Sequence, residues 1–370
     1  MDKKNIQMAE MPLTCNNLYE TLQFFTDKLG FKMESIAPAE KPSIAVISGY
    51  GIRIRLEPGN NPDPGSINLL CSEPALVVDG KLKLTAPNGT CINLIEAKSS
   101  LNIPKVKQTF VLTKMSESDQ WNKGRAGMWY RDLIPDRQGG YAVASHIRIL
   151  DGGPVSDYIH YHKILFQMIY CYKGWARLVY EDQGEPFVIE AGDCVLQPPQ
   201  IRHQVLESSL GMEVIELTCP ADHETCVDHE IKLPTSSIDS QRLFNGQHFI
   251  RHEAAKAEWK PWRMEGFEAR DIGIASATDG LAGVRVARSV GQPHTGFVSH
   301  DADLLFMFIL NGSAELNCDK IDSELLTAGD SFTVPSNMKH SLSKCSKDME
   351  LLEVALPAMF NTTHHTKGVR

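Results

Sequence analysis

Short apolar runs separated by turn-forming residues fill most of the chain from residue 126 onward. The runs are rich in Val, Ile, Leu, Phe and Tyr, and Gly, Pro and Asp interrupt them every few residues. This punctuation favours antiparallel β-structure, in a sandwich or a barrel, over alternating βαβ units. The sequence therefore predicts a mainly β fold for the larger part of the chain.

The first hundred residues follow a different pattern. Four apolar residues recur at helical spacing before Gly30, a natural C-terminal stop for a helix: Leu18, Leu22, Phe25 and Leu29. Three β-type runs come next, FKMESIA, SIAVISG and IRIRLEP. We expect a small α+β module with one helix followed by strands.

Two later stretches of the chain repeat each other. Their matching residues lie 137 to 139 positions apart, which is too long for a solenoid repeat and indicates a duplicated domain. The matched pairs are Arg131 with Arg270, Asp132 with Asp271, Gly174 with Gly312, Gly192 with Gly329, Pro198 with Pro335, and His203 with His340.

Composition and the repeat together predict six parts of the chain. They are a module at 1–98, a polar linker at 99–125, a first repeat domain at 126–231, a second linker at 232–262, a second repeat domain at 263–360, and a tail at 361–370.

Charge and cysteine content narrow the class of protein. The 37 Lys and Arg against 46 Asp and Glu give a net charge of −9, without a basic stripe, so nucleic acid and anionic membranes are poor partners. No apolar run approaches the ~20 residues of a membrane span, and no signal-type segment opens the chain, so we expect a cytoplasmic protein. The nine scattered cysteines lack a C-x-x-C pair, which argues against a disulfide framework or a zinc knuckle.

Candidate chemistry begins at His160 and His162, one residue apart in a predicted strand. Side chains alternate along a strand, so both imidazoles point to the same face. That arrangement suits a metal ion, although two such histidines also fit an ordinary polar strand face. Because one strand cannot surround a metal, a third ligand must come from a strand that crosses nearby.

The first repeat domain resembles the cupin superfamily in both of that family's motifs. It departs from them by one extra residue after the first Gly, Gln for the motif's Glu, Gln for an inner Gly, and Glu for the final Asn. The residues are Gly153, His160, His162, Gln167 and Gly174 in the first motif, and Gly192, Pro198, Gln200, His203 and Glu207 in the second.

This resemblance implies two tandem jelly-roll barrels, with a metal held by His160, His162 and His203, and Gln167 beside it. Three imidazoles suit Fe(II), Mn, Co, Ni or Zn and disfavour Mg or Ca. We expect Fe(II).

Gln167 stands where the family has a Glu, and a Gln cancels none of the metal's charge. One hypothesis is that the site prefers an anionic bidentate ligand, which supplies the missing charge. The alternative is that Gln167 only hydrogen-bonds a metal-bound water.

Three further residues are candidates for the site. Arg148 lies on a predicted strand face where it would meet an anionic substrate at the barrel mouth, or else it is an exposed surface Arg. Tyr158, two residues before His160, is expected to look inward as a pocket wall or phenolic donor. Glu207 is a candidate hydrogen-bond acceptor behind a ligand imidazole or a general base, and neither if it lies on an exposed strand end.

The second repeat domain lacks most of this chemistry. Val298 and Leu305 replace His160 and Gln167, and of the ligands only His300 and His340 remain, with His294 as one further candidate. We predict a metal-free domain that serves as a packing or dimerisation partner, so a homodimer is one expected assembly. The tail, with His364 and His365, is expected to fray.

The N-terminal module resembles the glyoxalase-like, or vicinal-oxygen-chelate, superfamily. The similar pieces are Phe24, Phe25, Leu29, Gly30, Phe31 and the turn at 87–89. The family's metal ligands are missing, since the first His of the chain is His146 and Asn93 stands where a Glu is expected. We interpret the module as degenerate and structural or docking in role, rather than a second active site.

Three functions remain open. The first is a non-haem Fe(II) dioxygenase acting on a small anionic chelating substrate. The second is a redox-neutral metal-dependent lyase, isomerase or decarboxylase, in which Glu207 or Tyr158 moves a proton. The third is a non-catalytic bicupin that binds a small molecule.

Overall fold

The computed structural model describes residues 5–61, 63–97, 101–117, 121–290, 296–319 and 321–365. Two compact units make up the chain, Met1–Ser100 and Leu101–Arg370. The first unit ends near the predicted module boundary at residue 98. Within the described residues, no helix is long and apolar enough to cross a membrane.

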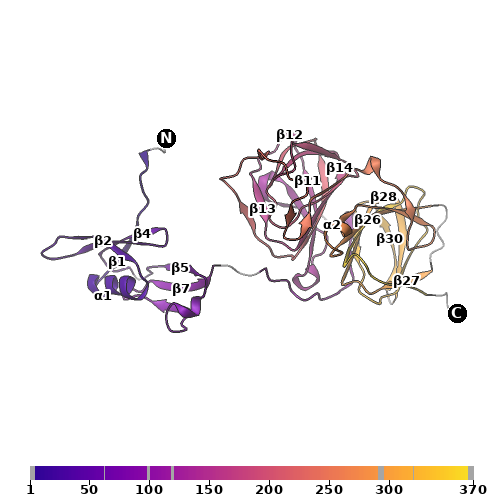
Figure 1. The fold of residues 1–370 in the computed structure, drawn as a ribbon. Coiled ribbons are helices and arrows are strands. Elements are labelled where there is room, and N and C mark those ends of the chain that lie inside the picture. The colour runs from indigo at the N-terminus through magenta and orange to yellow at the C-terminus, as the bar shows by residue number, and fades with distance from the viewer. Residues whose placement is uncertain are drawn as a thin grey trace. The chain divides into compact units, whose positions relative to one another are not determined.

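The first unit opens with a four-stranded sheet in the order β1-β4-β3-β2, with β1 parallel to β4 (Figure 1). The predicted helix lies between β1 and β2, where the Asn17 side chain caps it by accepting from the Glu20 N–H at 3.2 Å. Its apolar residues pack onto the sheet, as their spacing predicts. The elements are β1 (Met11–Cys15), α1 (Leu18–Gln23) with its continuation Phe24–Lys28, β2 (Lys32–Ala37), β3 (Ile44–Gly49) and β4 (Ile52–Pro58).

A three-stranded sheet, in the order β5-β7-β6, completes the first unit. β5 runs parallel to β7, so the sheet repeats the order of the first one with a strand fewer. A short 3₁₀ turn, Pro74–Leu76, stands where a second helix would come. The strands are β5 (Ser66–Cys71), β6 (Lys83–Thr85) and β7 (Cys91–Glu96).

The second unit consists of two tandem jelly-roll barrels, which confirms the predicted mainly β fold. The first barrel combines the sheets β23-β17-β14-β19-β11-β10-β9 and β16-β15-β18-β13-β20, with β12 beside β18. Its strands are β9 (Asn122–Lys123), β10 (Trp129–Asp132), β11 (Val143–Ile149), β12 (Gly153–Pro154), β13 (His160–His162), β14 (Phe166–Lys173), β15 (Trp175–Tyr180), β16 (Phe187–Glu190), β17 (Cys194–Leu196), β18 (His203–Ser208), β19 (Met212–Cys219), β20 (Thr225–Val227) and β23 (Ile250–His252).

The second barrel repeats this topology with the sheets β24-β25-β26-β33-β28-β31-β8 and β30-β29-β32-β27-β34. Its strands are β8 (Val111–Thr113), β24 (Lys260–Pro261), β25 (Phe267–Asp271), β26 (Gly283–Ser289), β27 (Phe297–His300), β28 (Leu304–Asn311), β29 (Ser313–Cys318), β30 (Ile321–Thr327), β31 (Ser331–Thr333), β32 (His340–Ser343), β33 (Glu350–Leu356) and β34 (Thr362–His365). A hairpin of β21 (Leu243–Phe244) and β22 (Gln247–His248) lies between β20 and β23, and a helical turn α2 (Ile274–Ala277) lies between β25 and β26 of the second barrel.

Alternating side chains divide the core of the second unit into layers. On β14, Met168 and Tyr170 pack between the barrels, whereas Ile169 and Cys171 face the interior of the first barrel. β28 is apolar on both faces. One face packs into the layer between the barrels, and the other packs into the interior of the second barrel. Its run LLFMFIL is therefore the core strand that the sequence predicts.

The two predicted linkers are more than connections, and this corrects the domain prediction. β8 lies in the 99–125 segment, before the first barrel, yet it pairs with β31 of the second barrel. β23 lies in the 232–262 segment and pairs with β17 of the first barrel. The segment before each barrel thus adds a strand to a sheet of the other barrel. The tail prediction is also wrong, because β34 pairs with β27 from Phe297 opposite His365 onward.

The matched Arg and Gly residues of the repeat form a reciprocal clasp between the barrels. Arg131 of the first barrel donates to the Gly329 carbonyl at 2.5 Å, and Arg270 of the second donates to the Gly192 carbonyl at 3.0 Å. The Asp that follows each Gly accepts from a backbone N–H of the exchanged segment. These bonds are Met115 N–H to Asp330 at 2.7 Å and Ala254 N–H to Asp193 at 2.8 Å. Several of the residues that match between the two repeats therefore form the contacts between the barrels.

Candidate metal centre

Three buried histidines converge inside the first barrel. His160 and His162 come from β13, and His203 is the first residue of β18, directly opposite His160 in the strand ladder. The ring centroids lie 4.2 Å apart for His160 and His203, and 5.1 and 5.3 Å apart for the other pairs. One ring nitrogen from each lies within 4.8 Å of the other two. The structure thus brings together the three residues that the motifs single out, in an arrangement able to hold a metal ion.

The outer nitrogens of these rings are held by hydrogen bonds. Nδ1 of His160 donates to the Tyr158 carbonyl at 2.7 Å, and Nδ1 of His203 donates to the Ile201 carbonyl at 3.0 Å. His162 Nδ1 lies 2.9 Å from the Thr225 hydroxyl. A carbonyl behind Nδ1 fixes the tautomer in which Nε2 carries a free lone pair, the form that binds a metal.

Burial also keeps these imidazoles neutral. It lowers the pKa of His160 with help from the Arg125 charge, and it lowers the pKa of His162 to about 2. The pKa of His203 falls well below its ordinary value for the same reason, together with the neighbouring imidazoles. A metal needs deprotonated ligands, so all three residues are ready to bind one at neutral pH.

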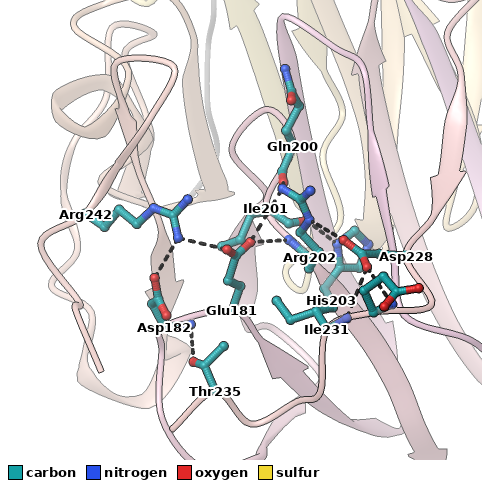
Figure 2. A network of polar contacts seen from close by, with 11 residues as sticks. Glu181, Asp182, Gln200, Ile201, Arg202, His203, Asp228, Ile231, Thr235 and Arg242 are labelled. Carbon is teal, nitrogen blue, oxygen red and sulfur yellow. Dashed lines mark hydrogen bonds and ion pairs between the residues drawn. The ribbon is translucent and has the colours of Figure 1, made fainter. Parts of the chain in front are cut away.

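The loop that carries His203 is anchored by a polar network on its outer side (Figure 2). The Arg202 side chain donates to Asp228 at 3.0 Å, and its backbone N–H donates to Glu181 at 3.2 Å. Arg242 binds Glu181 and Asp182 at 2.8 and 2.7 Å. Because Arg202 directly precedes His203, its contacts hold the backbone from which the His203 side chain points into the barrel.

Arg125 reaches the histidines from the segment predicted to be a linker. Its guanidinium binds Asp157 at 2.6 Å and lies 2.8 Å from Nε2 of His160. The Asp157 side chain is fully buried and also accepts from the Val205 N–H at 3.0 Å. The cupin motifs do not include Arg125. In the sequence, only the acidic Asp157 just before the H-x-H segment indicates that a cation could bind there.

Gln167 is fully buried on β14 and connects to the histidines through Gln197. The Gln197 amide lies 3.3 Å from the Gln167 carbonyl oxygen and 2.9 Å from Nε2 of His203. Tyr180 donates to the Gln197 carbonyl oxygen at 3.1 Å. The Gln167 amide nitrogen faces the carboxyl group of Glu216 and acts to lower its pKa. Gln167 is neutral, so it does not supply the negative charge that the Glu of the cupin motif would supply at this position.

A small cavity beside the histidines is walled mainly by apolar side chains. Its volume of about 60 Å³ has room for about two waters, at the ~30 Å³ that each water occupies in the liquid. The polar groups that line it are Arg125, Tyr130, His162, Tyr180, Gln197, His203 and Glu216, and the apolar ones are Met128, Ile147, Ile149, Ile169, Ala176, Leu178, Ile189, Val205, Met212 and Val214.

Glu216, on β19, is the carboxyl group of this cavity, and the motif analysis misses it. Burial raises its pKa to about 7, although the Arg125 charge and the nearby Gln167 amide act to lower it. Its strand position opposite Ile169 places it on the interior face. A carboxyl that titrates near neutral pH is suited to holding or transferring a proton.

The other three predicted site residues lie away from the cavity. Tyr158 precedes β13, its side chain is 41% exposed, and it contributes its carbonyl rather than its phenol. A register shift on β18 turns Glu207 outward, where it pairs with Arg177 at 3.2 Å. The Arg148 guanidinium stacks on Trp121 at 3.9 Å, because Ile147 and Ile149 occupy the interior face of β11. None of the three lines the cavity, although the Tyr158 ring lies edge-on against His160 with the ring centroids 5.8 Å apart.

The second barrel holds no equivalent trio among the described residues. Nε2 of His300 donates to the Val334 carbonyl at 2.9 Å, and its Nδ1 accepts from the Ala302 N–H at 3.2 Å. His300 therefore carries its proton on Nε2, whereas His160 and His203 carry theirs on Nδ1. His340 remains, and Val298 pairs with it where the first barrel has His160. His294 lies outside the described residues.

Comparison with known proteins supports the fold. No protein-family model and no curated protein matches the chain. Salicylate 1,2-dioxygenase from Pseudaminobacter salicylatoxidans matches with a TM-score of 0.54 and 15% identity, over 71% of this chain and 90% of its own. The oxalate decarboxylase–formate complex from Lactobacillus farciminis matches with a TM-score of 0.53 and 13% identity, over 71% and 89%. At such identities the likeness shows the fold alone, and that fold is the tandem jelly-roll of these structures.

Proposed function

We propose that this protein is a metal-dependent bicupin enzyme, an Fe(II) dioxygenase that acts on a small anionic chelating substrate in its first barrel. The observation that carries the proposal is the convergence of three neutral imidazoles beside a cavity that two of them, His162 and His203, line together with the Arg125 guanidinium. His160, His162 and His203 would hold the metal through Nε2. Bound Fe(II) would supply the one-electron chemistry that O₂ needs to react with an organic substrate.

The charges around the cavity support an anionic substrate. Three neutral histidines and the neutral Gln167 cancel none of the charge of a divalent metal, and Glu216 cancels part of it only in its ionised form, above a pKa of about 7. Arg125 adds a cation beside His160, partly balanced by the buried Asp157. A carboxylate or enolate would restore the balance, and Arg125 takes the role of anion partner that Arg148 cannot fill.

The remaining groups define what the barrel itself contributes. The walls are mainly apolar, which strengthens the electrostatic interactions of the few polar groups between them. Gln197 supplies amide hydrogen bonds next to His203. Glu216 holds a proton near neutral pH and can pass it to a substrate oxygen in the same cavity.

Oxygen uptake by anaerobically iron-loaded protein tests the proposal. The panel contains hydroxybenzoates, diketones, catechol-like compounds and thiols. We expect uptake with a small carboxylate-bearing member, and an increase of about tenfold or more in its KM in Arg125→Gln. No uptake with any compound, in protein that demonstrably contains iron, would refute the dioxygenase assignment.

Glu216 also favours a second candidate, a redox-neutral lyase, isomerase or decarboxylase. Its raised pKa and cavity position give it the proton-transfer role first considered for Glu207 and Tyr158, which lie outside the cavity. Activity that survives strict anaerobiosis and replacement of iron by zinc would select this candidate.

A further inference from the structure

The tip of the β9–β10 hairpin, residues 122–128, sends one charged side chain to the metal centre. Its backbone closes the turn, with the Gly124 N–H donating to the Met128 carbonyl at 2.8 Å and the Met128 N–H donating to the Arg125 carbonyl at 3.0 Å. Residues 122–124 and 127 are exposed, and β9 is the last strand of its sheet. A short hairpin at a sheet edge opens at little cost unless its side chains hold it to the rest of the protein.

Arg125 provides such a hold through two contacts. Its Nη1 donates to Asp157 at 2.6 Å, and its Nη2 lies 2.8 Å from Nε2 of His160. Because Nδ1 of His160 donates to the Tyr158 carbonyl, Nε2 is the acceptor nitrogen of this neutral ring and receives the guanidinium N–H. The Arg125 side chain thus joins an exposed turn to a fully buried histidine.

The lone pair that accepts from Arg125 is the one that a metal ion at His160 would need. A neutral imidazole has a single acceptor nitrogen, so it cannot accept from a guanidinium and bind a metal through that nitrogen at the same time. The guanidinium is also a cation, and a divalent ion at the same nitrogen would repel it. Arg125 and a metal therefore exclude each other at His160.

His203 also has a donor next to Nε2, but that donor differs from Arg125. Gln197, whose amide lies 2.9 Å from this nitrogen, is neutral and buried, and contacts with Tyr180 and Gln167 at 3.1 and 3.3 Å hold it in place. A metal would repel no charge there, and no exposed turn depends on the contact. Arg125 is thus the group that connects the histidines to the hairpin tip.

The hairpin also forms part of the wall of the cavity beside the histidines. Arg125, Met128 and Tyr130 line this cavity, together with His162 and His203. Movement of the tip away from the barrel would therefore widen the cavity on that side. Because a metal would bind only the state in which Arg125 has left His160, metal binding shifts the hairpin toward this open state.

We propose that Arg125 is a metal-controlled latch: it holds the hairpin tip closed while it donates to His160, and metal binding at the histidines releases it and widens the cavity for the substrate. This inference rests on the metal centre of the proposed function, but not on the reaction. It makes metal binding the step that prepares the barrel for its substrate.

The zinc affinity of EDTA-treated full-length protein, measured by competition with a chromophoric chelator, tests the exclusion. The double variant Arg125→Met, Asp157→Asn removes the donor together with its ion-pair partner, so the net charge stays the same, and the new amide can still accept from the Val205 N–H. We expect zinc to bind about tenfold or more tightly than in the wild type, because His160 no longer gives up a charged hydrogen bond. The matched control Arg177→Met, Glu207→Gln removes an outward-facing pair of the same barrel and should leave the zinc affinity unchanged.

Hydrogen exchange on the wild-type protein gives a second test, which needs no variant. Zinc should speed amide exchange in residues 122–128 while it slows exchange in β13 and β18. In the double variant, residues 122–128 should exchange fast with or without zinc. Equal zinc affinity in the double variant and the wild type, or unchanged or slower exchange of residues 122–128 on zinc binding, would overturn the latch and leave the metal centre in place. A wild-type protein that binds no zinc would overturn both.

Discussion

Replacement of Glu216 by Gln should make the metal-free protein more stable at alkaline pH. The folded protein holds the Glu216 proton up to a pKa of about 7, whereas the unfolded chain releases it near the ordinary value of 4.5. Between these values the folded state binds more protons than the unfolded one, so stability falls as pH rises. At about 1.4 kcal/mol per pKa unit, the full shift corresponds to about 3 kcal/mol at pH 8. Water in the cavity reduces this figure, and we expect at least about 1 kcal/mol.

Urea unfolding of EDTA-treated protein at pH 4.5 and pH 8 measures this difference. Glu216→Gln should gain stability over the wild type at pH 8 and little at pH 4.5. Glu213→Gln, on the same strand, is the matched control with the opposite sign. Burial acts to raise the pKa of Glu213, but hydrogen bonds from His146 and Lys173 outweigh it and lower the pKa, so this variant should lose stability at pH 8. A Glu216→Gln variant less stable than the wild type at pH 8 would refute the reasoning.

Two further substitutions test the charge balance and the joint between the barrels. Gln167→Glu should tighten metal binding by about tenfold or more and weaken the binding of anionic ligands, because the carboxylate cancels metal charge. Unchanged ligand affinity in isothermal titration would count against this argument. Gly192→Ala should cost about 1–3 kcal/mol in urea unfolding, because φ is +99° and a Cβ would lie 3.0 Å from Ala254. Gly211→Ala, with φ of +67° and no atom within 4 Å of a Cβ, should lose less, and equal losses would contradict a packed joint.

The sequence predicts the tandem barrels and the histidine trio because both depend on local rules. Strand alternation places His160 and His162 on one face, and the motif spacing brings His203 opposite them. The same alternation fails at Glu207, because a register shift on β18 reverses the face after Val205. It also places Arg148 on one face of its strand, but period-2 alternation does not say which face of β11 lines the cavity.

The residues missed by sequence reasoning act over long separations in the chain. Arg125 meets Asp157 and His160 only after the strands fold, and Glu216 enters the cavity from a strand some fifty residues beyond Gln167. The exchanged strands β8 and β23 are equally hidden, since each pairs with the barrel farther from it in the sequence. Short polar segments of this kind resemble linkers until their partner strands are known.

Metal content provides the most direct test of the metal centre. The protein is purified without added metal and analysed by mass spectrometry, alongside His203→Ala and the second-barrel variant His340→Ala. We expect close to one transition-metal ion per chain in the wild type and in His340→Ala, and a large loss in His203→Ala, since one of three ligands is gone. Equal metal content in His203→Ala and the wild type would contradict the assignment of His160, His162 and His203 as the metal ligands.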